Sequence, residues 1–90
     1  MKVYPETTIK YVKNCIYNFL ISLPKSKELE NRYQPLLPII KRKSTQQLKK
    51  IAEKTTENLL LKIKNINELG HLEDSDLLRE VLMEAIPNND

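Results

Sequence analysis

The stretch that decides the fold is residues 44–69, STQQLKKIAEKTTENLLLKIKNINEL. Ser44 and Gln47 have the spacing of a capping box, and Gly70 stands where a left-handed residue ends a helix. Between them, apolar and small residues return every three or four positions on one face, as a packed helix requires: Leu48, Ile51, Ala52, Thr55, Leu59, Ile63, Ile66 and Leu69. The sequence therefore predicts one long helix over residues 44–69, about 40 Å in length at about 1.5 Å per residue.

Three further helices are predicted on either side of it. Pro5 opens a helix that runs to about Leu23 and is apolar nearly all round, which is typical of a helix that is central or covered by another chain. Ser26 caps a short helix to about residue 34, and a kinked connector containing Pro35 and Pro38 follows. The last helix spans residues 76–86. A single glycine in the chain argues against the many tight turns of a β fold. We therefore expect an all-α, four-helix bundle-like domain over residues 1–90.

Charge is divided unevenly along the chain. The whole sequence has 15 Lys and Arg against 12 Asp and Glu, a formal net charge of +3. Residues 1–64 hold 14 of these cations and 5 of the acids, whereas residues 65–90 hold 1 cation and 7 acids. An asymmetry of this kind affects how the protein attracts and orients charged partners. It does not indicate the fold. The two ends could pair head to tail or steer an acidic partner.

The composition limits the cellular compartments in which the protein is expected. Cys15 is alone, so the chain has no intramolecular disulfide and is not a stapled secreted scaffold. The apolar stretch 11–23 is too short to span a bilayer and lacks the order of a signal peptide. We expect an intracellular protein, cytoplasmic or nuclear, with no membrane contact.

A basic cluster is the first candidate binding site, and its members are Lys41, Arg42, Lys43, Lys49, Lys50 and Lys54. Cations beside a helix N-terminus oppose the helix dipole, so stability alone does not explain them, and they would suit a phosphate or carboxylate group. A solvated face and an acidic protein surface are alternatives, and so is a nucleic acid contact. Nucleic acid is disfavoured because the cluster has one Arg and no interleaved aromatic residues.

An apolar surface is the second candidate. With Leu48 at zero and about 100° per residue, Leu59 falls near 20°, Leu60 near 120° and Leu61 near 220°, so one layer of neighbours cannot bury all three. Tyr17 and Ile21 lie off the apolar stripe of the first helix. These residues predict a protein or self-association interface: Tyr17, Ile21, Leu60 and Leu61. The alternative is that neighbouring helices cover both flanks. Lys62 falls on the apolar side and should extend to its edge.

No catalytic, cofactor or metal site is predicted. His71 with Glu73, Asp74 and Asp76 lacks both the spacing of a zinc site and the loop that calcium needs. The chain also has no nucleophile paired with a base and no glycine-rich phosphate loop. We expect a protein that is not an enzyme.

The order of elements over residues 25–86 is a short helix, a basic connector, a long helix, an acidic turn and a short helix. This order resembles a histone fold with an extra N-terminal helix, and Asp74-Ser75-Asp76-Leu77-Leu78 stands where such folds start their last helix. The resemblance implies association with nucleic acid, but no functional residues are carried over from it. The preferred hypothesis is a non-enzymatic protein–protein interaction module, a small subunit of an oligomer or larger complex. The alternative is a subunit that binds the nucleic acid backbone.

Overall fold

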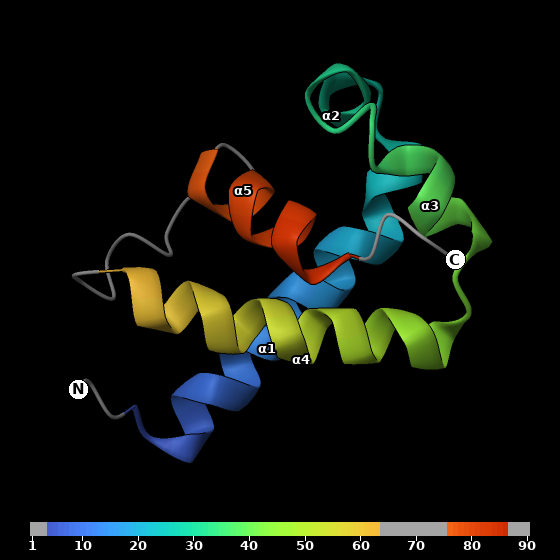
Figure 1. Ribbon diagram of the computed structural model, residues 1–90. Helices are drawn as coiled ribbons and strands as arrows, with labels where there is room; N and C mark the ends of the chain where they lie inside the picture. The colour runs from blue at the N-terminus through green and yellow to red at the C-terminus, as the bar shows by residue number, and fades with distance from the viewer. Residues whose placement is uncertain (1–3, 64–75, 87–90) are drawn as a thin grey trace.

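The computed structural model describes residues 4–63 and 76–86, and every regular element within these two ranges is helical. In chain order the elements are α1 (Glu6–Ser22), the 3₁₀ turn η1 (Leu23–Lys25), α2 (Lys27–Arg32), α3 (Leu37–Arg42), α4 (Thr45–Lys62) and α5 (Asp76–Ala85). Helix α4 packs against α1, which crosses it, and against α5, while α2 and α3 contact η1 (Figure 1). The predicted all-α class is confirmed, and α4 is its organising helix. The described residues form five α-helices where the sequence predicted four.

The N-terminus of α4 is built as predicted. Ser44 Oγ accepts a hydrogen bond from the backbone N–H of Gln47 at 3.3 Å, and Gln47 Oε1 accepts one from the backbone N–H of Ser44 at 2.8 Å. These two bonds satisfy N–H groups that have no partner within a helix. The start of the helix is therefore fixed by four consecutive residues.

The C-terminus of α4 comes earlier than predicted. Lys62 is its last residue, and Ile63 has an extended backbone with φ −75° and ψ 145°. The apolar period continues past this point, but β-branched Ile63 is a weaker helix former than the leucines before it, and it is buried in its extended conformation. At 18 residues the helix is about 27 Å long. The stretch 64–69 and Gly70, on which the longer prediction also rested, lie outside the described residues.

Helix α1 follows the prediction closely. It begins after Pro5 and buries Val12, Ile16 and Leu20, which are four residues apart and share one face. It gives way to η1 at Pro24, because proline has no N–H to continue the helical hydrogen bonds.

The sequence predicted a kinked connector around Pro35 and Pro38. The structure instead has a helix in this region, because residues Leu37–Arg42 form α3. Pro38 lies in the first turn of this helix, where the missing N–H has no intrahelical acceptor and the fixed φ suits the helix. Leu37 and Ile40 are buried, so α3 adds to the core. The preceding helix α2 is capped by Ser26, whose Oγ accepts a backbone hydrogen bond at 3.4 Å.

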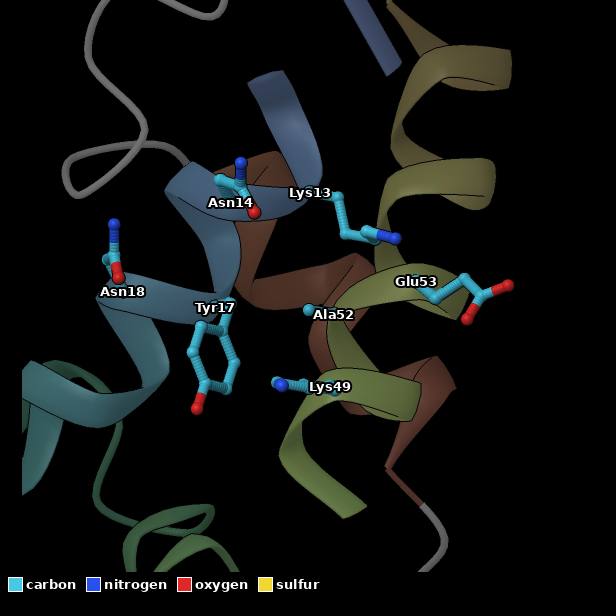
Figure 2. A pocket seen from close by; sticks show the side chains of 7 residues that line it. All are labelled: Lys13, Asn14, Tyr17, Asn18, Lys49, Ala52 and Glu53. Carbon is cyan, nitrogen blue, oxygen red and sulfur yellow. The ribbon is translucent and has the colours of Figure 1, made fainter. Parts of the chain in front are cut away.

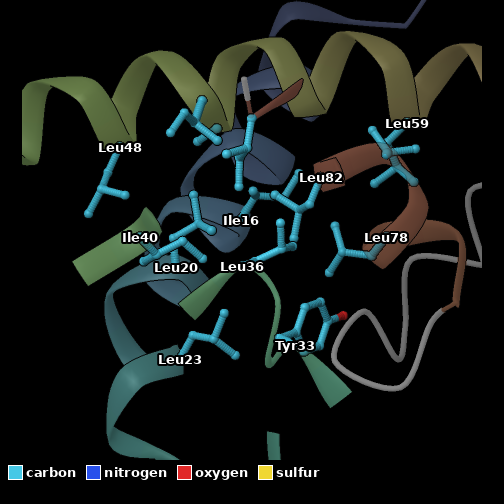
Figure 3. Packing of buried hydrophobic residues seen from close by; sticks show 14 of the residues in the cluster. Ile16, Leu20, Leu23, Tyr33, Leu36, Ile40, Leu48, Leu59, Leu78 and Leu82 are labelled. Carbon is cyan, nitrogen blue, oxygen red and sulfur yellow. The ribbon is translucent and has the colours of Figure 1, made fainter. Parts of the chain in front are cut away.

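The core lies among α1, α3, α4 and α5, with Tyr33 at one end (Figure 3). Its largest fully buried side chains are Ile16, Leu20, Leu23, Tyr33, Leu59, Leu78, Leu82 and Ile86. The rings of Phe19 and Tyr33 meet edge to face, with centroids 5.3 Å apart, which is a favourable arrangement for aromatic pairs. Helix α5, predicted over residues 76–86, is confirmed over Asp76–Ala85. It supplies Leu78 and Leu82 to this set, and Ile86 lies just after its end.

Helix α4 is buried over a wider part of its circumference than the single apolar stripe that the sequence predicted. Leu59 and Leu60 are both buried, at 1% and 7% exposure, whereas Leu61 is 69% exposed. The prediction that Leu60 belongs to an exposed apolar interface is therefore wrong, and for Leu60 the alternative that neighbouring helices cover it holds. Because α1 and α5 both pack on α4, its flanks are covered within the single chain. For Leu61 the prediction of an exposed position is correct.

Some of the oppositely charged residues pair with one another on the surface of the chain. Arg32 of α2 binds Asp76 of α5 at 2.9 Å, and this hydrogen bond lowers the pKa of Asp76. Lys62 of α4 binds Glu84 of α5 at 2.7 Å, which raises the pKa of Lys62. Lys62 thus reaches the edge of the apolar face, as predicted. The acidic helix α5 consequently has cationic neighbours in its own chain.

Candidate protein-binding surface

The second half of α1 has an exposed side without charge. The sequence from Asn14 to Pro24 contains no charged residue. Asn14 and Asn18 are nevertheless exposed, and Ile21 is 39% exposed. We call these three residues the exposed α1 face. A solvated helix face is usually charged or polar. The two asparagines fit this description, but the exposed Ile21 and the lack of any charge are also compatible with a contact surface.

Hydrogen bonding between two further side chains of α1 raises a pKa. Tyr11 is exposed and is hydrogen bonded to Cys15 one turn along the helix, and this contact raises the pKa of the Tyr11 hydroxyl.

A groove runs beside the exposed α1 face, between α1 and α4 (Figure 2). Its volume is about 640 Å³, within the range of roughly 300–1,000 Å³ that is common for ligand sites. The residues that line it come from both helices: Lys13, Asn14, Tyr17, Asn18, Lys49, Ala52 and Glu53. We call it the α1–α4 groove. Ala52 is fully buried, so its small side chain is part of the floor.

Tyr17 and Lys49 meet in this groove. The Lys49 Nζ lies 5.8 Å from the centroid of the Tyr17 ring, within reach of a cation–π interaction. The sequence placed Tyr17 in an apolar interface and Lys49 in an anion-binding cluster. The structure therefore joins one member of each predicted site in a single location.

A second cation lies in the same groove. Figure 2 shows Lys13 extending from α1 toward α4, while Lys49 extends from α4 toward Tyr17. Glu53 is the one acidic residue among the seven that line the groove. The lining therefore has a formal charge of +1, with both lysines accessible from the groove.

The rest of the basic cluster lies elsewhere. Lys41 and Arg42 occupy the last turn of α3, where the helix dipole favours cations, so stability does explain these two. Lys43 is half-buried and lines, with Lys50, a shallow depression of about 250 Å³ near the end of α5. Lys54 is exposed on the outward side of α4. The six cations predicted as one cluster thus do not share one surface.

The predicted apolar interface is also divided. Tyr17 is half-buried and Ile21 exposed on the same side of α1, one turn apart. Leu61 is exposed on the outward side of α4, and Leu60 is buried in the core. Only Tyr17 and Ile21 are therefore brought together next to the groove.

Five groove residues were not predicted as site residues: Lys13, Asn14, Asn18, Glu53 and Ala52, of which Ala52 was predicted on the apolar face of the long helix. The polar residues of α1 were visible in the sequence as interruptions of its apolar stretch. Tyr17 follows Lys13 by four positions, and Glu53 follows Lys49 by four, so each pair shares a helix face. Which two faces meet is decided by the crossing of α1 and α4.

Comparison with known proteins gives no relative from which a function could be transferred: no family model, no curated protein and no solved structure matches the chain. The resemblance to a histone fold gains no support, because α3 occupies the predicted connector.

Within residues 4–63 and 76–86, no helix has the length and apolar character needed to cross a membrane. The same ranges hold no group of three His, Cys, Asp or Glu side chains placed to bind a metal ion. Of the four residues considered as metal ligands, His71, Glu73 and Asp74 lie outside them, and Asp76 pairs with Arg32.

Proposed function

We propose that this chain is a non-enzymatic protein–protein interaction module, a small helical subunit that binds a partner protein or a second copy through the exposed α1 face and the adjoining α1–α4 groove. The observation that carries the proposal is the uncharged, exposed side of α1 next to a groove containing Tyr17.

The composition of this surface supports a protein partner. The centres of protein interfaces are depleted in charged residues and enriched in aromatic ones, while their rims are polar. Here Ile21 and Tyr17 would form the centre, and Lys13 and Lys49 the rim. Leu61 lies outside this surface, and single exposed leucines are normal on monomeric proteins.

Nucleic acid binding is the weaker candidate. A phosphate backbone is bound by cations aligned on one surface. At about 100° per residue, Lys50 and Lys54 lie on one side of α4, and Lys49 lies about 100° or more around the helix from both. Lys49 is also engaged with the Tyr17 ring and has Glu53 beside it in the groove. A polyanion would meet that carboxylate.

The test compares two variants that each place a carboxylate at an exposed apolar position. Ile21→Glu alters the exposed α1 face, and Met83→Glu is the matched control, because Met83 is 51% exposed on α5. Light scattering of the purified chain and affinity capture after cross-linking in its native cells measure self-association and partner binding.

We expect a dimer or a stoichiometric complex that Ile21→Glu weakens at least about tenfold, equivalent to about 1.4 kcal/mol, and that Met83→Glu leaves intact. A monomer that captures no partner would refute the proposal. Equal binding by the wild type and Ile21→Glu would refute the assignment of this face.

A further inference from the structure

The α1–α4 groove also indicates what kind of partner segment it accepts. This step rests on the proposed function and concerns the chemistry of the segment that enters the groove. The relevant features are two lysines on opposite walls, two asparagines one turn apart and a single carboxylate.

The lysines are available to an anion. The described residues form ion pairs between Lys10 and Glu6, between Arg32 and Asp76, and between Lys62 and Glu84, and neither Lys13 nor Lys49 takes part in them. The Tyr17 ring beneath Lys49 holds that ammonium group at the groove, so less side-chain entropy is lost when an anion binds. A carboxylate placed between Lys13 and Lys49 would be bound from both walls.

The asparagines suit a polypeptide backbone. Asn14 and Asn18 are four residues apart on α1, a rise of about 6 Å. Peptide groups on one side of an extended strand repeat at roughly 6.6 Å. Each side-chain amide has both donors and an acceptor, so each can pair with a backbone C=O and N–H. No hydrogen bond from either side-chain amide is formed within the described residues, where Asn18 accepts only through its backbone carbonyl, from Ser22.

Glu53 limits the negative charge that a bound segment can bring into the groove. As an acid in a groove with two lysines, it repels a second anion close to the first. A single carboxylate flanked by neutral residues meets this condition, and a continuous run of phosphates does not.

We infer that the α1–α4 groove binds an extended segment of the partner protein that has one acidic side chain, with its carboxylate between Lys13 and Lys49 and its backbone along Asn14 and Asn18.

The experiment selects short random peptides, displayed on phage, against the immobilised full-length chain. A selected peptide is then synthesised with its acidic residue and with the corresponding amide, and each is titrated into the chain by fluorescence polarisation. Lys13→Met and Lys49→Met remove a charge and keep the side-chain length, whereas Lys49→Arg keeps the charge. Lys54→Met is the control, because Lys54 is exposed on α4 away from the groove.

We expect the selected peptides to share an Asp or Glu, and the amide version to bind at least about tenfold more weakly. Lys13→Met and Lys49→Met should each show a similar loss of affinity, whereas Lys49→Arg should bind the peptide as the wild type does. Lys54→Met should change the affinity by less than about twofold. Circular dichroism confirms that each variant is folded.

Selection of no peptide, selection of peptides without an acidic residue, or affinity that ignores Lys13 and Lys49 would overturn the inference. Binding of a labelled oligonucleotide that depends on both lysines would replace it with a nucleic acid site. If Ile21→Glu loses the native partner while Lys49→Met retains it, the proposed function stands and the acidic-segment inference fails.

Discussion

Replacing Thr55 with valine should stabilise the protein. Thr55 is fully buried on α4, and its Oγ1 has no hydrogen-bond partner among the described residues. A buried hydroxyl left unpaired costs about 1–3 kcal/mol of folding free energy relative to a paired one. Valine has the same branched shape and nearly the same helix propensity, so the substitution removes the polar atom and leaves the helix otherwise unchanged.

Thr56 provides the matched control in the next position. It is also buried, at 1% exposure, but its Oγ1 donates a hydrogen bond to the carbonyl oxygen of Ala52 at 2.7 Å. Thr56→Val removes a bond worth about 0.5–1.5 kcal/mol net, so it should leave stability unchanged or lower it. The comparison separates the cost of an unpaired hydroxyl from the general effect of adding a methyl group to this helix.

The assay is urea unfolding followed by far-ultraviolet circular dichroism, with thermal melting as a second measurement. Thr55→Val should raise the free energy of unfolding by about 1 kcal/mol without changing its dependence on urea, and raise the melting temperature by roughly 4–8 °C. A Thr55→Val protein no more stable than the wild type would refute the reasoning, and so would an equal gain from Thr56→Val.

Other substitutions test exposure, electrostatics and capping. Leu61→Glu should change the free energy of unfolding by less than about 0.5 kcal/mol because Leu61 is 69% exposed, whereas Leu60→Ala should cost about 2–5 kcal/mol; comparable losses in urea unfolding would contradict this assignment of burial. The hydrogen bond from Arg32 lowers the pKa of Asp76, so this contact stabilises the fold at neutral pH and is lost as the pH falls below about 4 toward the lowered pKa. Asp76→Asn should weaken that acid dependence in a pH series of melts, and an unchanged pH profile would exclude the contribution. Ser44→Ala should cost about 1 kcal/mol through loss of the capping box, and an unaltered urea midpoint would show that the cap is dispensable.

Features that depend on a few neighbouring residues could be predicted from the sequence. The capping box at Ser44, the cap at Ser26 and the buried face of α4 formed by Leu48, Ile51, Ala52, Thr55 and Leu59 are all confirmed. Each depends on hydrogen bonds or on a periodicity that spans three or four residues, so the information lies close together in the chain. The all-α class follows from these local signals.

Two errors in the predicted helices, the end of α4 and the missed helix α3, mark the limit of that local information. The apolar period includes Ile63, yet the backbone of Ile63 itself is extended, because the same side chain can be buried in either conformation. Pro38 indicated a kinked connector, but a proline is equally at home in the first turn of a helix, which is what α3 provides. Tertiary packing chose between alternatives that the local sequence allowed.

The candidate site was predictable only in pieces. Periodicity assigned Tyr17 and Lys49 to helix faces, but it could not show that these faces meet or that Leu60 is covered by the same chain. By itself, the sequence determined which residues form helices and which stripe is apolar. The tertiary structure decided which flanks of α4 are covered and where a groove remains, because these depend on how α1 and α4, more than twenty residues apart in the chain, cross and pack.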